Sequence, residues 1–289
     1  MSAIEIKNLK KFYGRTKAVS DISLSIAKGE IFGFLGPNGA GKTTTIRCLL
    51  DFIRPTSGSI KIDGKDSRLE SVAVRQRIGY LSGDVRLYEN WTGQDHIGLM
   101  QKIRGRSGVA NDLIRRLDFN PKAKTKNLSS GNRQKLGLIL ALMHEPDVLI
   151  LDEPTVGLDP LLQNTIYEIL REFKQKGRTV FMSSHYLREV ELVCDRVGII
   201  RNGLLVASEI ISNLKKMRLY HVSVFFSEPT KVNFGEAAQV IRSSGTTAEL
   251  HVQGDINPLI EKISRYKLRD LEIERASLED IFMEYYEKE

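Results

Sequence analysis

The sequence predicts an α/β fold with a mostly parallel sheet, an inserted helical block and a small α+β extension at the C-terminal end. Two observations support this prediction. Runs that read as strands alternate with runs that read as helices along most of the chain. In addition, the run DVLILDEP at 147–154 is apolar up to its final carboxylates, which is typical of a strand buried on both faces of a parallel sheet.

The predicted strands and helices follow one another in the order that such a fold requires. Alternating or apolar runs indicate the strands, and glycine, proline and asparagine mark the breaks between elements. Strands are expected at 4–9, twice within 20–35 around a Lys28-Gly29 turn, at 59–64, at 78–81, at 178–184 and on both sides of Asn202-Gly203. Helices are expected after residue 44, in several pieces between about 90 and 145, at 160–176 and at 186–194.

The last part of the chain reads as a separate extension. We expect a first domain over 1–213, with a helical subdomain at about 84–145, and a small α+β extension over 214–289. In the extension, HVSVFF, TAELHV and LRDLEIER read as strands, whereas EAAQVIRS, PLIEKISRY and SLEDIFMEYYE read as helices. The extension carries no motif that indicates chemistry, so we expect it to regulate or to dock rather than to catalyse.

The composition is that of an ordinary globular protein with a basic balance. The chain has 289 residues, of which 41% are hydrophobic, and a formal net charge of +7. This charge permits attraction to nucleic acid or to an anionic membrane, but the basic residues are spread along the chain, so we expect a solvated surface and no nucleic-acid partner. Cys48 and Cys194 lie far apart, which favours two reduced thiols. No apolar stretch is long enough to span a bilayer and no signal peptide is recognisable, so we expect a cytoplasmic protein.

Residues 36–44, GPNGAGKTT, form a phosphate-binding loop. They fit the pattern G-x-x-x-x-G-K-[ST] in full, with a strand-like run before them and a helical run after them. The glycines let backbone N–H groups wrap a phosphate, and the following helix adds its N-terminal dipole. Lys42 supplies a charge for the β- and γ-phosphates, and the Thr43 hydroxyl can ligate Mg²⁺. The expected nucleotide-binding residues of this loop are Gly36, Pro37, Asn38, Gly39, Ala40, Gly41, Lys42, Thr43 and Thr44.

Two further stretches supply the polar groups that phosphate hydrolysis needs. Asp152 ends the apolar strand and is expected to hold Mg²⁺, while Glu153 is expected to orient and polarise the attacking water. Two acids at a strand end could instead cap the next helix, but the phosphate loop favours catalysis. His185 follows the next predicted strand, where strand ends meet ligands in open α/β sheets, and is expected to contact the γ-phosphate.

A second phosphate-binding helix start follows at 128–132, LSSGN. Two serines and a glycine stand directly ahead of the apolar run LGLILALM. The spacing of these residues does not decide whether they bind the chain's own nucleotide or that of a partner.

Taken together, these motifs resemble those of the nucleotide-binding subunits of ABC transporters over about residues 3–210. The resemblance rests on GPNGAGKTT, LSSGN, LILDEP, VGLD (156–159) and SSH (183–185), which occur in that order. LSSGN is similar to the family signature LSGGQ, with Ser130 and Asn132 as departures. The sequence SLEDIFMEYYE resembles the end of the extension in the drug- and antibiotic-exporter (ABC-2-like) branch of the family.

The resemblance implies a P-loop ATPase core whose ligands are ATP and Mg²⁺, with sites shared between two subunits. Ser129, Ser130, Gly131 and Asn132 would bind the γ-phosphate of the ATP that the opposite subunit holds. Tyr13 would stack on adenine, and Asp159 would bridge to the other subunit across the dimer. Where the family commonly has a glutamine that reaches Mg²⁺, this chain has Gly83, with Asp84 as the nearest replacement.

The function expected from the resemblance is ATP hydrolysis that drives export through a separate transmembrane permease subunit. A second ATPase subunit, in a homodimer or a heterodimer, would complete the sites, and the protein would lie on the inner face of the cell membrane. Leu87 and its neighbours either pack locally or form a groove for the permease. The alternatives are a soluble ATPase of this type that acts on nucleic acid or the ribosome, and an ATP-binding regulator that hydrolyses nothing. Glu153 and His185 disfavour the regulator.

Overall fold

The computed structural model describes residues 2–105, 108–216 and 219–275. The chain divides into two compact units, Met1–Glu209 and Ile210–Glu289.

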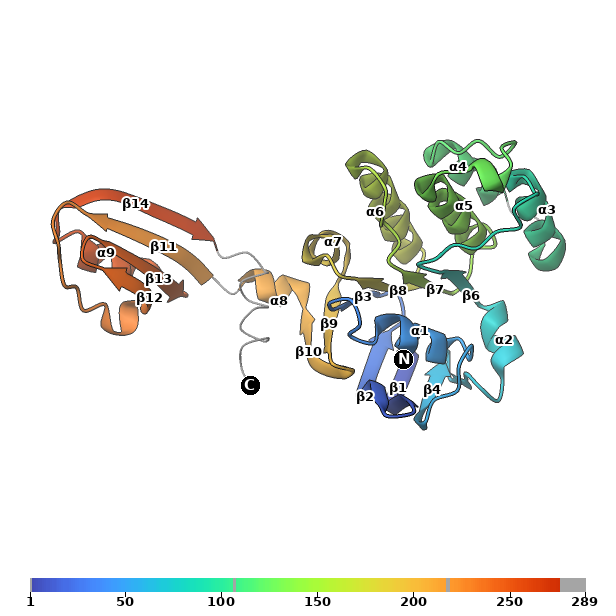
Figure 1. The fold of residues 1–289 in the computed structure, drawn as a ribbon, viewed down its shortest axis with the longest axis horizontal. Coiled ribbons are helices and arrows are strands. Elements are labelled where there is room, and N and C mark those ends of the chain that lie inside the picture. Colours follow the sequence, from blue (N-terminus) through green and yellow to red (C-terminus); the bar gives the residue numbers. More distant parts are fainter. Residues whose placement is uncertain (1, 106–107, 217–218, 276–289) are drawn as a thin grey trace. The chain divides into compact units, whose positions relative to one another are not determined.

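A ten-stranded mixed sheet forms the frame of the first unit (Figure 1). Its strand order is β5-β4-β1-β2-β10-β9-β3-β8-β7-β6. Neighbouring strands in the run β9-β3-β8-β7-β6 are parallel, whereas β1 pairs antiparallel with both β2 and β4. The strands are β1 (Ser2–Tyr13), β2 (Thr16–Ala27), β3 (Ile31–Leu35), β4 (Ser57–Ile62), β5 (Lys65–Asp66), β6 (Ile78–Leu81), β7 (Val148–Asp152), β8 (Thr179–Ser184), β9 (Arg196–Arg201) and β10 (Leu204–Ile210).

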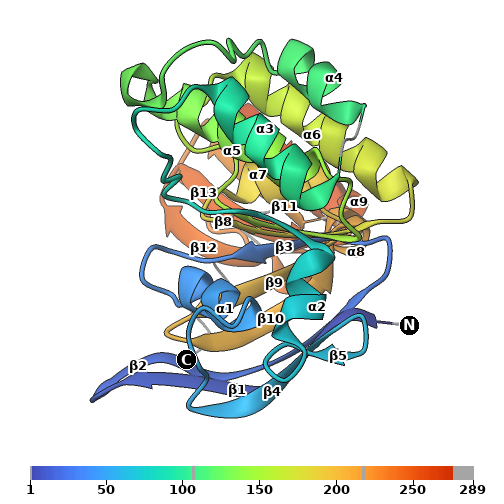
Figure 2. The ribbon, with the colours of Figure 1, turned by 90° about the vertical axis from the view of Figure 1, so that its right-hand side faces the viewer.

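Helices cover both sides of the parallel strands, as in the predicted α/β class. Figure 2 shows α3, α4, α5 and α6 on one side of β3 and β8, and α1 and α2 on the other. These helices are α1 (Lys42–Leu49), α2 (Ser71–Gln76), α3 (Gly93–Arg104), α4 (Val109–Arg116), α5 (Ser130–Leu142), α6 (Pro160–Gln175) and α7 (Leu187–Val193), with a 3₁₀ turn at Thr125–Asn127. The α/β prediction is confirmed, with a sheet that is parallel in its central part and antiparallel around β1.

The core lies around α1, between the parallel strands and the antiparallel ones. Ile46 and Leu49 of α1 are fully buried and belong to the same apolar cluster as Ile4 of β1 and Ile150 of β7. All five residues of β7 are buried, as the continuous apolar run predicted. Burial on both faces fixes the position of this strand, and with it the carboxylates that follow.

The second unit is a four-stranded antiparallel sheet with its own apolar core. Its strand order is β12-β13-β11-β14, and Val222, Val224, Leu250 and Leu259 are among its buried residues. The elements are α8 (Ile211–Lys216), β11 (Leu219–Phe226), a 3₁₀ turn at Gly235–Ala237, β12 (Gln239–Ser244), β13 (Thr247–Gln253), α9 (Asn257–Ile263) and β14 (Leu268–Arg275).

One helix predicted in this unit is wrong, and another lies outside the described residues. EAAQVIRS (236–243) is not helical, because most of it forms β12, which pairs antiparallel with β13. The two strands are joined by a two-residue turn after Ser244, in which Gly245 has a positive φ of 50°, and pairing across this turn outweighs the helix propensity of alanine and glutamine. The predicted helix SLEDIFMEYYE falls among residues that the structure does not describe.

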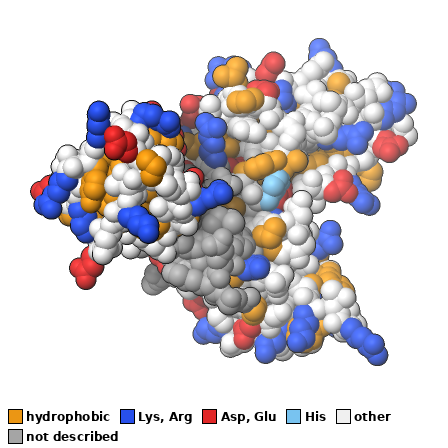
Figure 3. Space-filling model, turned by 60° about the vertical axis from the view of Figure 1, so that its left-hand side comes forward, with side chains coloured by type: hydrophobic (Ala, Val, Ile, Leu, Met, Phe, Trp, Pro, Cys, Tyr) orange, Lys and Arg blue, Asp and Glu red, His pale blue; other side chains and the backbone are white. Residues whose placement is uncertain are grey.

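Figure 3 shows basic and acidic side chains interspersed over the face that it draws. Among the helices of the described residues, none is both long and apolar enough to cross a membrane.

Candidate functional site

The phosphate loop connects the end of β3 to the start of α1, and two of its glycines are required by close packing. A Cβ on Gly36 would lie 2.3 Å from the carbonyl oxygen of Ile200, and one on Gly41 would lie 2.5 Å from that of Ala18. Gly41 also has a positive φ of 110°, at the position just before α1 begins. Any other residue would push the loop away from the sheet.

Lys42 is the first residue of α1, and its ammonium group points back into the loop. The side chain is only 6% exposed, and Nζ donates to the carbonyl oxygens of Gly36 at 2.6 Å and Pro37 at 3.3 Å. Nζ also lies 3.1 Å from Oε1 of Glu153. The structure therefore brings the cation of the loop and the predicted water-polarising carboxylate into direct contact.

Thr43 and Asp152 meet at the carboxyl ends of the strands. The Thr43 hydroxyl donates to Oδ2 of Asp152 at 2.8 Å, and the Ser183 hydroxyl donates to Oδ1 at 2.6 Å. Ser183 lies opposite Asp152 in the register of β7 and β8 and is completely buried. A hydroxyl and a carboxylate at this separation are the oxygen ligands that Mg²⁺ takes in nucleotide sites.

Glu153 follows β7 in a left-handed conformation, and its side chain is held at both oxygens. Its φ is 53°, which is uncommon for a residue with a side chain and occurs often at functional sites. Oε2 lies 2.5 Å from Nδ1 of His185, while Oε1 faces Lys42. The backbone N–H of Glu153 donates to the Ser183 hydroxyl at 3.0 Å, which anchors the turn.

These groups surround one open cleft of about 520 Å³. Most predicted nucleotide-binding and catalytic residues line it, namely Pro37, Asn38, Gly39, Gly41, Lys42, Thr43, Thr44, Asp152, Glu153 and His185. Gly36 and Ala40 are buried in the loop itself. Tyr13 is not among the lining residues, and its ring is 47% exposed with Nζ of Lys11 at 4.8 Å from the ring centroid.

The second helix start lies away from this cleft. Ser129 caps α5 by accepting from the N–H of Asn132 at 3.3 Å, and none of the residues 129–132 lines the 520 Å³ cleft. Ser129 and Ser130 are exposed. Asp159 caps α6 by accepting from the N–H of Leu162 at 3.0 Å. The family resemblance implies an inter-subunit bridge for Asp159, and this bridge stays a prediction.

Comparison with known proteins identifies the family to which this geometry belongs. A family model described as "ABC transporter" matches residues 19–156. The Nod factor export ATP-binding protein I of Paraburkholderia xenovorans (strain LB400) is 34% identical over 98% of this chain and 96% of its own length. The bacitracin transport ATP-binding protein BcrA of Enterococcus faecalis is 35% identical over 86% of this chain and 81% of its own length. The chain belongs to the ABC transporter family.

Within this family the chain is an ATP-binding subunit and an ATPase. A solved structure of an ATP-binding subunit of an ABC transporter matches it with a TM-score of 0.69 and 29% identity, over 74% of this chain and 92% of that chain. The linearmycin resistance ATP-binding protein LnrL of Bacillus subtilis (strain 168) is 38% identical over 71% of this chain and 68% of its own length. The family resemblance inferred from the motifs is thus confirmed.

Gly83, which stands where the family resemblance implies a glutamine, lines the cleft without a side chain. A Cβ on Gly83 would lie 3.4 Å from the carbonyl oxygen of Asp152 and 3.6 Å from its Oδ2. The cleft is also lined by Ser82 and Asp84, so the Asp84 carboxylate is adjacent to Gly83 in the sequence. Asp84 is itself paired with Arg86 at 2.9 Å.

Two residues that hold the site were not predicted from the sequence. Ser183 donates to the Asp152 carboxylate and accepts from the backbone N–H of Glu153. Gln134, from the second turn of α5, is 4% exposed and donates to the carbonyl oxygens of Glu153 at 3.2 Å and Pro154 at 3.1 Å. Helix α5, which begins at Ser130, is therefore bonded to the loop that carries Glu153. A polar residue on the apolar face of α5 was the signal that could have revealed Gln134.

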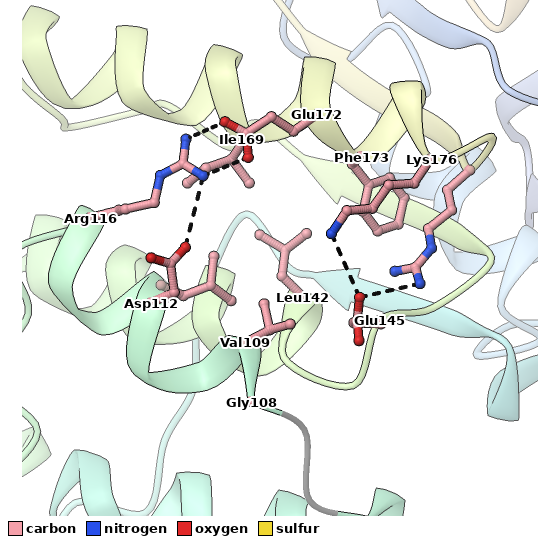
Figure 4. Close-up of a pocket in the computed structure, with 12 residues that line it drawn as sticks. Gly108, Val109, Asp112, Arg116, Leu142, Glu145, Ile169, Glu172, Phe173 and Lys176 are labelled. Carbon is pink, nitrogen blue, oxygen red and sulfur yellow. Dashed lines mark hydrogen bonds and ion pairs between the residues drawn. The ribbon is translucent and has the colours of Figure 1, made fainter.

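Another cleft, of about 260 Å³, lies between α4, α5 and α6 (Figure 4). Arg116 of α4 makes two hydrogen bonds to Glu172 of α6, at 2.6 and 2.8 Å, and this guanidinium holds the pKa of Glu172 below its ordinary value. On the other side Glu145 pairs with Arg178 at 3.3 Å and Lys176 at 3.7 Å. The charges of this cleft are thus paired with one another, and the phosphate loop lines the 520 Å³ cleft instead.

Proposed function

We propose that this chain binds ATP with Mg²⁺ in the 520 Å³ cleft, hydrolyses it, and drives export through a separate membrane subunit. The observation that carries the proposal is the convergence of three contacts in one cleft. Lys42 touches Glu153, Glu153 touches His185, and Thr43 touches Asp152. These contacts support a site in which phosphate binding, water activation and metal ligation would lie side by side.

In this proposal each group of residues in the cleft has its own role in hydrolysis. The loop N–H groups and the Lys42 ammonium bind the β- and γ-phosphates. Hydrogen bonds to these charged phosphates are stronger than hydrogen bonds between neutral groups. Thr43 and Asp152 hold Mg²⁺, which when bound neutralises phosphate charge. Glu153 accepts a proton from the attacking water, and His185 fixes the carboxylate through Nδ1 and contacts the γ-phosphate.

Adenine would be recognised outside the loop by stacking. The half-exposed ring of Tyr13 offers a π-face, and Lys11 lies over that ring. Stacking on an aromatic face tolerates some variation in geometry, which suits a base that extends out of the phosphate loop.

We propose that a second ATPase chain completes each site. Residues 129–132 are a phosphate-binding helix start, yet they do not line the cleft of their own chain. Two of these residues, Ser129 and Ser130, are exposed and thus accessible to a partner. In a dimer, each ATP would lie between the phosphate loop of one chain and the helix start of the other.

The membrane subunit would dock beside the nucleotide cleft. A groove of about 370 Å³ is lined by residues between β6 and α3, among them Asp84, Val85 and Leu87, together with Thr125 and Arg133. Tyr88 is 64% exposed next to it. Asp84 lines both the cleft and the groove, so nucleotide binding and docking would share a loop. Export is proposed because the similar proteins named above include a Nod factor exporter and a resistance protein.

The test compares two substitutions in the cleft with a third outside it. Glu153→Gln should retain ATP binding and lose about 10²–10⁴-fold in turnover, the usual cost of removing a general base. Lys42→Ala should weaken ATP binding itself, measured by calorimetry, because a charge-assisted contact worth about 1.5–3 kcal/mol is lost. Glu172→Gln removes a carboxylate from the other cleft and should leave both quantities unchanged. Normal turnover in Glu153→Gln would remove Glu153 from the mechanism.

A further inference from the structure

Behind the catalytic pair lies a buried carboxylate, Glu189 of α7. Its side chain is 4% exposed, and burial raises the pKa of this carboxyl, although two hydroxyl donors oppose the rise. Oε1 accepts from the Thr155 hydroxyl at 2.7 Å, and Oε2 accepts from the Ser184 hydroxyl at 2.6 Å. Both hydroxyls are buried as well, Thr155 at 3% exposure and Ser184 at 0%. A carboxylate is costly to bury, so a structural role alone would be served as well by an apolar side chain.

The two hydroxyls lie close in sequence to the catalytic pair, one after β7 and one at the end of β8. Thr155 lies two positions after Glu153, and Ser184 immediately precedes His185. One side chain therefore ties the turn after β7 to the end of β8. The charge of Glu153 also contributes to the raised pKa of Glu189, which places the two carboxylates within electrostatic reach of each other.

The Ser184 end of this bridge also fixes the backbone beyond His185. The N–H of Tyr186 donates to the Ser184 hydroxyl at 2.9 Å, and the Tyr186 ring packs on the His185 ring with centroids 3.8 Å apart. Together with Glu189, these contacts leave the His185 ring little freedom to turn. The contact between His185 and Glu153, at 2.5 Å, depends on that orientation.

We propose that Glu189 is a positioning residue, which sets the distance between Glu153 and His185 by bridging Thr155 and Ser184. This inference rests on the proposed roles of Glu153 and His185 in hydrolysis. The phosphate loop takes no part in the bridge, so Glu189 acts on turnover and leaves ATP binding alone.

The test replaces the carboxylate without opening a cavity. Glu189→Leu keeps a similar volume and removes both hydrogen bonds, so a purely structural role predicts normal activity and equal or higher stability. The positioning role predicts a fall in kcat of about 10- to 100-fold, because a misplacement of an ångström at a catalytic group costs that much. The Kd for ATP should not change, and Glu189→Gln, which retains one acceptor and the shape, should restore kcat to within about threefold. Glu191→Gln, on the same helix and partly exposed, is the matched control and should behave as the wild type.

Three results would overturn the proposal. These are a wild-type kcat in Glu189→Leu, a parallel loss of ATP affinity and kcat, or no rescue by Glu189→Gln. If Glu189→Leu does not fold, Thr155→Val and Ser184→Ala each remove one hydroxyl at nearly constant volume, and each should lower kcat alone. Normal turnover in Glu153→Gln contradicts the proposed function itself, whereas normal kcat in Glu189→Leu beside an inactive Glu153→Gln contradicts only the positioning role.

Discussion

The proposed chemistry of this protein depends on individual side chains at the carboxyl ends of β7 and β8. Asp152 ends one strand, Ser183 stands opposite it on the next, and Glu153 takes a left-handed turn between them. The strands are buried and cannot shift, so the polar groups that follow them are held at fixed separations. An apolar run followed by two acidic residues was enough to locate Asp152 and Glu153. The apolar run indicates a buried strand, and the acidic residues indicate where that strand ends.

The residues that support this pair were harder to predict. Ser183 and Gln134 carry common side chains whose role depends on neighbours distant in sequence. Gln134 bonds to carbonyls 19 and 20 positions later, and Ser183 to a carboxylate 31 positions earlier. Local patterns give strand and helix positions but not the register between strands, and it is the register that brings Ser183 to Asp152.

One prediction at this scale concerns Cys48, in α1 beneath the phosphate loop. Burial raises the pKa of the Cys48 thiol from 9.0 to about 11, with Lys11 opposing the shift. Folding favours the neutral thiol of Cys48. The contribution of this thiol to the free energy of unfolding is therefore complete below pH 9 and is lost as the pH rises towards 11. The loss should amount to roughly 2–3 kcal/mol in the free energy of unfolding. Urea unfolding of wild type and Cys48→Ala between pH 8 and about pH 11 should show a steeper decline in the wild type. Equal slopes would contradict this prediction.

At the scale of elements, two helix starts of the same chemical kind have different surroundings. α1 begins inside the cleft, whereas α5 begins at exposed residues away from it. The sequence predicted both starts but left open which nucleotide the second one binds. It also predicted the strands around the site and missed β12, where pairing with β13 outweighs local propensity. The buried strands around the site were therefore predictable from their apolar runs. Strand β12, which is exposed and lies at the edge of its sheet, was not.

The second prediction follows from the position of α5, and it tests sharing across a dimer. Gly131→Asp places a carboxylate at the helix start, where it would repel the γ-phosphate of the partner's ATP. The variant should therefore bind ATP as a monomer but fail to complete a partner's site. A Lys42→Ala chain mixed with a Gly131→Asp chain should regain ATP hydrolysis, because one of the two shared sites is intact. Binding within one chain would leave both sites defective.

The control for this mixture addresses crowding at Gly131. A Cβ there would lie 3.3 Å from the carbonyl oxygen of Gly157, so any substitution presses on the loop before α6. Gly131→Ala adds that Cβ without the charge and should retain most activity. Mixed dimers that form, as shown by differential tagging, yet hydrolyse no more ATP than either parent would count against a shared site.

At the scale of the whole molecule, the chain consists of two units with separate cores, and the proposed site lies in the first of them. The nucleotide cleft is lined entirely by residues of the first unit, and the core of the second is built from β11, β13 and α9. From the change in its pattern, the sequence predicted an extension over 214–289, and the structure divides after Glu209. It offered no chemical motif in the second part, and the described residues add no group of acidic, histidine and cysteine side chains that could hold a metal ion.

The last prediction therefore concerns removal of the second unit. A chain that ends at Lys216 keeps α8, with the buried Ile211 and Leu214, and lacks the four-stranded sheet of the second unit. Because a separate core can be lost without opening the first one, this truncated chain should fold and bind ATP with the affinity of the full chain. Calorimetric titration with ATP, after thermal unfolding has shown a cooperative transition, provides the measurement. A folded truncation that binds no ATP would mean that the second unit completes the nucleotide site. Unchanged ATP affinity with altered turnover would instead assign regulation to that unit.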